Sequence, residues 1–448
     1  MPTGRPDLSR IALSDTMARL LPASEDLNAL EPTGAGAAAD WGREIALWPI
    51  EALRGADPVL GLAVLMIIAL LAGEAVRRAT GLPRALGAML VGALASPLAL
   101  SLVARAELDA WKPLIDLAVG LLVFELGARI RPRWLRDNPW LTLKSLAEAL
   151  LSGLAVAGAL MLLGVDHQSA TLAGAVAMAG SPVITMAVLG ELRPRGQVTE
   201  RLLVMTAVNT VCAVLALSIW QVAVTLDADG FEWQPALAGV LYALCGSYLL
   251  GAFAGLLLER LSRQIRGTGL ATLQLALVVI AAMLAAQFTV SPLLSLLVAG
   301  MVARARMGHR LQVEPQLGSG GAALTLLLLL TLGLLSTLDG LLGLWPLVAA
   351  IIGARLLAKV GTVLLLARPS GLGWRQSLGL GLALQPASSL PLLLTSATLG
   401  WPAHLPAPPA EPMQALLIAL TLLQLSGPVW LQLGSQQPLP GLPGQTGQ

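Results

Sequence analysis

Residues 341–367 read LLGLWPLVAAIIGARLLAKVGTVLLLA, a run in which only Arg355 and Lys359 are charged. A helix rises about 1.5 Å per residue, so this run exceeds the ~30 Å of hydrocarbon in a typical bilayer. We therefore expect a transmembrane helix here. Its two cations stand one helical turn apart near mid-membrane, where a charged side chain costs roughly 2.5–3.5 kcal/mol on insertion scales.

The rest of the chain has the same character. Of its 448 residues, 56% are hydrophobic and only 12% are charged, and the mean hydropathy is +0.76. Soluble proteins carry about 25% charged residues. These values exclude a soluble enzyme, a secreted disulfide scaffold and a disordered chain. A net charge of +2 gives no indication of nucleic-acid binding.

Apolar runs of spanning length follow one another from residue 58 to residue 432. The runs are continuously apolar, whereas the strands of a membrane barrel alternate, so we predict an all-α polytopic membrane protein. Residues 1–57 are predicted to be an N-terminal extracytoplasmic tail, in which residues 8–21 could form a short amphipathic helix, and residues 433–448 a cytoplasmic C-terminal tail. About 13 transmembrane helices are expected, at 58–76, 82–100, 112–130, 140–164, 169–190, 201–224, 236–258, 268–286, 288–304, 320–337, 342–366, 376–399 and 412–432.

Arginines occur in every second loop, and the loops between them are poor in basic residues. Basic loops remain on the cytoplasmic side, so an odd number of spans places the N-terminus outside and the C-terminus inside. The composition suggests a bacterial inner membrane. The basic clusters are Arg77, Arg78 and Arg84; Arg129, Arg131, Arg133 and Arg136; Arg193, Arg195 and Arg201; Arg260, Arg263 and Arg266; Arg304, Arg306 and Arg310; and Arg368 and Arg375.

Enzyme motifs are absent from the sequence. It contains no HExxH, GxSxG or GxxxxGK[ST] pattern, and its three histidines lie near the ends of spans. We therefore predict no enzyme activity, no cofactor and no metal centre beyond an alkali cation. A transporter, a channel or a membrane sensor remains.

Most carboxylates in the spans have a local explanation. Each has a basic residue three or four positions away, which is the pairing distance on a helix. Glu125 remains a secondary candidate for a functional role, because it lies more than one turn inside its span. The expected pairs are Glu74 with Arg77 and Arg78, Glu125 with Arg129, Asp116 with Lys112, and Glu148 with Lys144.

Arg355 and Lys359 have no such partner, because their span contains no carboxylate. Both must face the interior of the bundle and meet carbonyls, helix C-terminal dipoles, water or a ligand. A lysine in these surroundings could take up and release protons. The two residues are therefore interpreted as a proton carrier or as structural cations that brace broken helices.

Two spans contain helix-breaking sequences at their centres, Ala179-Gly180-Ser181-Pro182 and Gln385-Pro386-Ala387-Ser388-Ser389. Each break is flanked by small polar residues, and the two lie seven spans apart. This separation is what two repeats of opposite orientation would give. Unwound segments that pair across inverted repeats are typical of a midplane binding site in secondary transporters.

Five segments resemble one known family. Residues 80–93 are similar to its GLPR-x-LG stretch, and residues 121–127 to its LLLFELGL segment. Residues 180–182 read Gly-Ser-Pro where the family often has Thr-Asp-Pro. Residues 354–360 resemble the span with a buried basic residue, and residues 381–390 occupy the second broken helix.

The sequence thus resembles the cation:proton antiporter superfamily, the sodium/proton exchanger-like transporters, over residues 58–432. The resemblance implies inverted repeats with two broken crossed helices. It also implies a core domain that moves against a scaffold, and a homodimer in the lipid bilayer. The implied activity is exchange of a monovalent cation for protons by alternating access.

The ion site departs from the family pattern. The sixth span usually carries an Asn-Asp or Asp-Asp pair whose second Asp binds the cation, but here the pair is Asn209-Thr210. Ser181 replaces the Asp of the first break, and Ser388 a common Glu of the second. The predicted ligands are therefore neutral oxygens of Ser181, Asn209, Thr210, Gln385 and Ser388, in helices broken at Gly180, Pro182 and Pro386.

Two alternatives remain open at this stage. If Arg355 and Lys359 are unpaired, the site could accept an anion or another solute. The loss of the carboxylates is also compatible with a non-transporting family member that acts as a sensor or as a partner in a membrane complex.

Overall fold

The structure, a computed structural model, describes residues 58–96, 103, 105–130, 138–194, 196–229, 233–265, 268–308, 319–387 and 410–435. All of them belong to one compact unit, Asp57–Gln448. The predicted N-terminal tail, Ser388, the second half of the predicted span 376–399 and most of the C-terminal tail lie outside the described residues.

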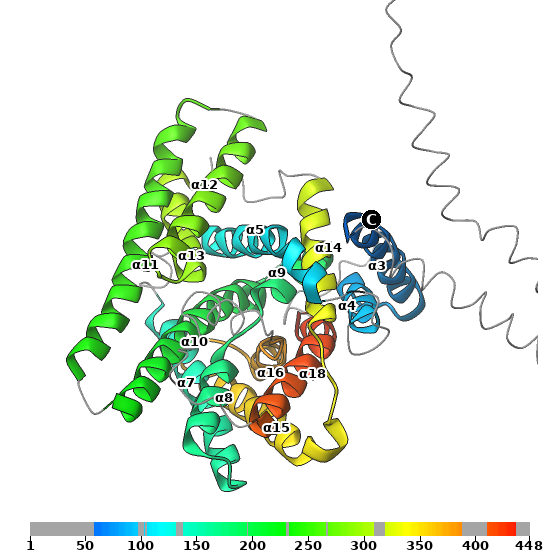
Figure 1. The fold of residues 1–448 in the computed structure, drawn as a ribbon, viewed down its shortest axis with the longest axis vertical. Helices are drawn as coiled ribbons and strands as arrows, with labels where there is room; N and C mark the ends of the chain where they lie inside the picture. Colours follow the sequence, from blue (N-terminus) through cyan, green and yellow to red (C-terminus); the bar gives the residue numbers. More distant parts are fainter. Residues whose placement is uncertain are drawn as a thin grey trace, which may run out of the picture. The chain divides into compact units, whose positions relative to one another are not determined.

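The described part of the chain consists of helices joined by turns and loops, without strands (Figure 1). The prediction of an all-α polytopic membrane protein is confirmed, and each expected span overlaps a helix. The helices are α3 (Pro58–Thr80), α4 (Arg84–Ala95), α5 (Arg105–Arg129), α7 (Pro139–Leu162), α8 (His167–Met178), α9 (Pro182–Leu192), α10 (Gln197–Asp229), α11 (Trp233–Ser262), α12 (Thr268–Gln287), α13 (Pro292–Met307), α14 (Ser319–Leu334), α15 (Leu341–Leu365), α16 (Trp374–Ala383) and α18 (Ala410–Ser435).

Eight helical segments of the described residues are long and apolar enough to cross a membrane, with α8 and α9 taken together as one. The helix α4 and residues 321–334 of α14 are apolar but shorter. Many large apolar side chains of the long helices are exposed, such as Leu71 on α3 and Leu357 on α15. Exposed apolar faces of this kind are what a lipid-facing surface requires.

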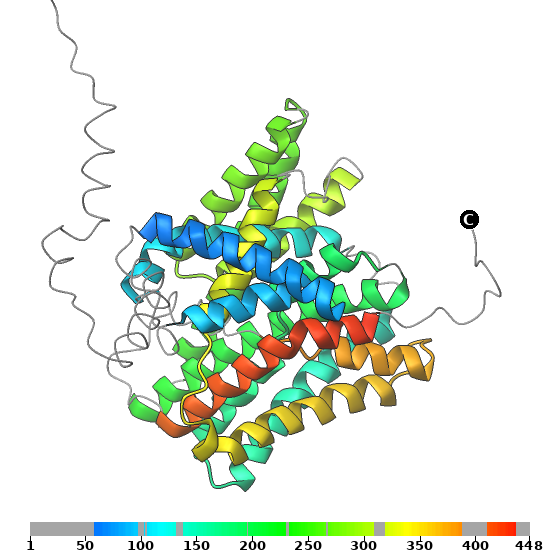
Figure 2. The same ribbon diagram turned by 90° about the vertical axis from the view of Figure 1, so that its right-hand side faces the viewer.

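The helices pack in two groups, with α9 in contact with both (Figure 1). One group contains α3, α4, α5, α11, α12, α13 and α14, and the other contains α7, α8, α10, α15, α16 and α18. Figure 2 shows α18 between α4 on one side and α15 on the other. We call the second group the crossing group, because it contains both predicted helix breaks.

Glycines allow the closest helix crossings. A Cβ on Gly92 of α4 would lie 2.1 Å from the Leu330 carbonyl oxygen of α14, and a Cβ on Gly127 of α5 would lie 2.1 Å from that of Leu297 on α13. Small residues at membrane helix interfaces let the backbones approach and gain van der Waals contact. A methyl group at either position would force the two helices apart.

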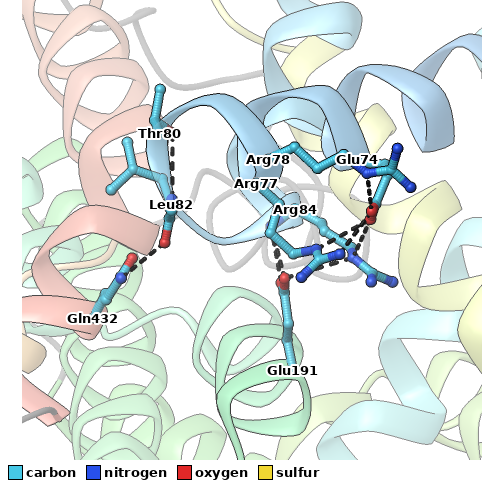
Figure 3. Close-up of polar contacts among 9 residues, drawn as sticks. Glu74, Arg77, Arg78, Thr80, Leu82, Arg84, Glu191 and Gln432 are labelled. Carbon is cyan, nitrogen blue, oxygen red and sulfur yellow. Dashed lines mark hydrogen bonds and ion pairs between the residues drawn. The ribbon is translucent and has the colours of Figure 1, made fainter.

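Polar contacts join the basic loops to one another (Figure 3). The carboxylate of Glu74 accepts hydrogen bonds from Arg77 and Arg78, as predicted, and also pairs with Arg84 at 3.0 Å. Glu191, at the end of α9, accepts from the backbone N–H of Arg84 at 2.9 Å, which satisfies an N–H at the start of α4. The loop after α3 and the end of α9 are therefore neighbours.

Candidate functional site

The two predicted breaks meet in the crossing group. The first break separates α8 from α9, and the second follows α16, where residues 385–387 are no longer helical. The backbone N–H of Ser181 donates to the carbonyl oxygen of Pro386 at 3.0 Å. Segments about 200 residues apart thus have their backbones in direct contact, as expected if the two breaks pair across inverted repeats.

Local sequence explains why the first break forms where it does. Ser181 is the N-cap of α9, and its Oγ accepts from the N–H of Ile184 at 3.3 Å. Pro182 occupies the first turn, where a missing N–H costs nothing. Gly180 faces α10, where a Cβ would lie 3.4 Å from Thr206. Gly180, Ser181 and Pro182 therefore act together to end one helix and begin the next.

Arg355 of α15 binds the ends of both broken helices. Its buried guanidinium donates to the carbonyl oxygens of Ala177, of Ala179 at 2.8 Å and of Gln385 at 3.4 Å. Carbonyls at a helix C-terminus carry partial negative charge, so a cation is favoured there. Of the partners predicted for Arg355, which were carbonyls, helix C-terminal dipoles, water or a ligand, the structure shows carbonyls and a helix C-terminus.

Lys359 pairs with Glu148 of α7, and both side chains are fully buried. The predicted local pair of Glu148 with Lys144 is wrong, because the Lys144 ammonium donates to Ser370 Oγ at 3.1 Å instead. The pairing rule for a single helix failed because α7 turns Glu148 toward α15. Lys144 and Glu148 are both buried on α7, so the partner that each side chain meets depends on the helix or loop packed against it.

These contacts also fix the relative direction of α7 and α15. Ser152 of α7 and Arg355 of α15 both donate to the Ala177 carbonyl oxygen, the former at 3.5 Å. One turn away, Glu148 meets Lys359. Residue numbers fall along α7 as they rise along α15, so the two helices are antiparallel. Like the two breaks, these helices are predicted spans seven positions apart, as inverted repeats require.

Asn209 and Thr210 lie buried on α10, which packs against α7 and α8. Thr210 Oγ1 donates to the Thr206 carbonyl oxygen at 2.8 Å. Neither the amide nitrogen nor the amide oxygen of Asn209 has a hydrogen-bond partner among the described residues. Cys212, one turn farther on, is also buried on α10.

The remaining predicted ligands have mixed outcomes. Gln385 is buried, its Nε2 donates to the Gly381 carbonyl oxygen at 3.0 Å, and its Oε1 has no partner in the described part of the chain. Ser388 lies outside the described residues. Glu125 pairs with Arg129 at 2.6 Å, as predicted, and is about a quarter exposed on α5, outside the crossing group.

Comparisons with known proteins agree with this geometry. The family model for the transmembrane sodium/hydrogen exchanger matches residues 63–432. This chain belongs to the sodium/hydrogen exchanger family. A comparison with curated proteins gives no match.

Two solved structures of the sodium proton antiporter MjNhaP1 from Methanocaldococcus jannaschii share the fold. One, determined at pH 8, has a TM-score of 0.63 and 16% identity and covers 85% of this chain and 98% of MjNhaP1. The other, an electron-microscopy map, has a TM-score of 0.66 and 15% identity and covers 84% of this chain and 96% of MjNhaP1. The prediction that the chain belongs to the cation:proton antiporter superfamily is confirmed.

Within this family fold, sequence reasoning missed Glu148. Lys144 lies four residues before Glu148, so the local pairing rule assigned Glu148 to Lys144 and not to Lys359. Its depth could have revealed it, because Glu148 is nine residues from the start of α7, or about 14 Å at the rise of a helix. That places it near mid-membrane, at the depth where Lys359 needs a counter-ion.

Proposed function

We propose that this protein exchanges a monovalent cation for protons across the membrane by alternating access. The observation that carries the proposal is the crossing of two broken helices, braced by Arg355, beside the buried Lys359–Glu148 pair. Membership of the exchanger family and the shared fold with a sodium proton antiporter support it. The same observations favour a transporter over an enzyme.

The proposed cation ligands are the oxygens of Ser181, Asn209, Thr210, Gln385 and Ser388, together with freed backbone carbonyls of the breaks. Hard alkali cations prefer oxygen ligands of this kind. Lys359 carries the proton in this scheme and releases it when the cation arrives. Arg355 stays charged and holds the broken helices in place, because its guanidinium is not deprotonated in proteins.

The contacts favour a cation over an anion as the transported solute. The anion alternative requires Arg355 and Lys359 to be unpaired, whereas Lys359 pairs with Glu148 and Arg355 binds three carbonyls. A buried carboxylate would repel an anion. The non-transporting alternative predicts a folded protein that moves no ion, and the transport assay below distinguishes it.

The basic loops are proposed to face the cytoplasm, with the N-terminus outside and the C-terminus inside. Contacts between loops support a common side: Arg84 with Glu191, Arg201 with the Ser370 carbonyl oxygen, and Gln432 near the end of α18 with the Gly81 carbonyl oxygen. Residues 58–432 form the transporter domain of the proposal, with residues 1–57 and 433–448 as tails. A homodimer in a bacterial inner membrane completes it.

Reconstitution into proteoliposomes tests the function. A pH-sensitive dye inside the vesicles reports proton movement when sodium, potassium or lithium is added outside. We expect at least one cation to drive proton movement in the wild-type protein and none to do so in Lys359→Ala. A flat trace for every cation, from protein that is folded and inserted, would exclude exchange and leave the sensor alternative.

A further inference from the structure

Among the residues whose side-chain burial the structure describes, Glu148 is the only buried carboxylate. Its Oε1 accepts a hydrogen bond from Lys359, while its Oε2 is buried without a partner within the described ranges. A buried charged oxygen that lacks a hydrogen bond loses its hydration without compensation, so native structures avoid it unless the group has a further ligand or role.

A second group with unmet hydrogen bonds lies on the neighbouring helix. Asn209 is fully buried, and neither end of its amide has a partner among the described residues. Its helix, α10, packs against α7. Two adjacent helices therefore each present a buried oxygen without a hydrogen-bond partner among the described residues.

We propose that Glu148 is the cation-binding carboxylate of this exchanger, supplied by α7 rather than by α10. The inference rests on the proposed exchange function and adds the residue that carries its negative charge. A monovalent cation binds Glu148 Oε2 and takes the place of the Lys359 ammonium, and the amide oxygen of Asn209 is one of its further ligands. By the resemblance, Thr210 of α10 stands where the family has its carboxylate, so in this proposal the charge comes from α7, two spans earlier in the chain.

Charge balance makes the arrangement consistent. Before binding, the site holds the Glu148 carboxylate and the Lys359 ammonium. After binding, it holds the carboxylate, one monovalent cation and a neutral Lys359, whose proton has passed to water on the open side. The net charge of the buried site is the same in both states, so neither state leaves a buried charge without a counter-charge. A divalent cation would leave one uncompensated positive charge.

The test compares Glu148→Gln and Glu148→Asp with wild type in the proteoliposome assay. Glu259→Gln is the matched control, because Glu259 is also a helix carboxylate with a basic partner, Arg263, but lies partly exposed near the end of α11. Glu148→Gln should lose about tenfold to a hundredfold of the exchange rate, the equivalent of one charged hydrogen bond. Glu259→Gln should match wild type.

Glu148→Asp keeps the charge and fold but withdraws the oxygen by about one methylene. It should raise the sodium concentration for half-maximal exchange by about tenfold and change the ratio of lithium to sodium transport. Glu148→Gln combined with Thr210→Asp, which returns a carboxylate to α10, should recover part of the exchange.

The possible results distinguish the role of Glu148 from the exchange function itself. If wild type exchanges cations and Glu148→Gln retains its rate while Glu148→Asp leaves the sodium dependence and selectivity unchanged, Glu148 is not the cation-binding carboxylate, and the proposed function still stands. If folded wild-type protein exchanges no cation, the proposed function fails and this inference fails with it.

Discussion

Arg355 is expected to be the strongest single brace of the crossing group, and its replacement by Gln tests this role. The guanidinium donates to two carbonyls at the end of α8 and, over a longer 3.4 Å, to Gln385 after α16. A charge-assisted hydrogen bond contributes about 1.5–3 kcal/mol. Counting the two bonds to α8 and treating the third as weak, we expect Arg355→Gln to lower the free energy of unfolding by about 3–6 kcal/mol.

Arg355→Lys should recover about half of that loss. Lysine restores the positive charge, but a single ammonium on a flexible stem cannot bridge two helix ends as the planar guanidinium does. Because Arg355 is a brace in this reasoning and not a proton carrier, Arg355→Lys should also keep part of the cation exchange with an unchanged dependence on external pH.

Equilibrium unfolding in mixed detergent micelles, followed by tryptophan fluorescence, measures these differences. Arg263→Gln is the control, because Arg263 is a largely exposed cation paired with Glu259 and should cost less than about 1 kcal/mol. A loss below about 1 kcal/mol for Arg355→Gln would refute the argument that the guanidinium holds the broken helices together.

Three further predictions concern other contacts. Lys359→Gln leaves a buried carboxylate uncompensated and should lower the free energy of unfolding by about 3–5 kcal/mol. Adding Glu148→Gln should restore most of this stability, and additive losses in the double variant would contradict the ion pair. Gly92→Ala forces a methyl group against α14, so it should lower the free energy of unfolding by about 1–3 kcal/mol and lower the thermal midpoint in detergent. Gly158→Ala is the control, because a Cβ there would have nothing within 4 Å and should leave the midpoint unchanged. Equal midpoints for the two variants would disprove the close crossing. Glu191→Gln weakens the hydrogen bond from the Arg84 backbone N–H and should lower the free energy of unfolding by about 1 kcal/mol at low salt and by less at high salt. A difference in thermal midpoint between variant and wild type that does not change with salt would contradict an electrostatic contribution.

The sequence was informative wherever the physical cause is local. Continuous apolar runs predicted helices, because hydrocarbon leaves the backbone no other hydrogen-bond partners. Gly180, Ser181 and Pro182 predicted the first break, because capping and a missing N–H act within one turn. The depth of Arg355 predicted a buried cation that needs carbonyl partners, and α8 and Gln385 supply them.

The partner of Lys359 was decided by the tertiary structure alone. Glu148 is 211 residues away along the chain, and the local rule assigned it to Lys144. Which faces of α7 and α15 meet depends on how whole helices pack. A buried cation without a counter-ion is costly, so Lys359, which has no carboxylate in its own span, pairs with Glu148 across that interface. Continuous apolar runs and local spacing thus determined that this is a helical membrane protein with two interrupted spans. Only packing across distant helices decided where its buried negative charge lies.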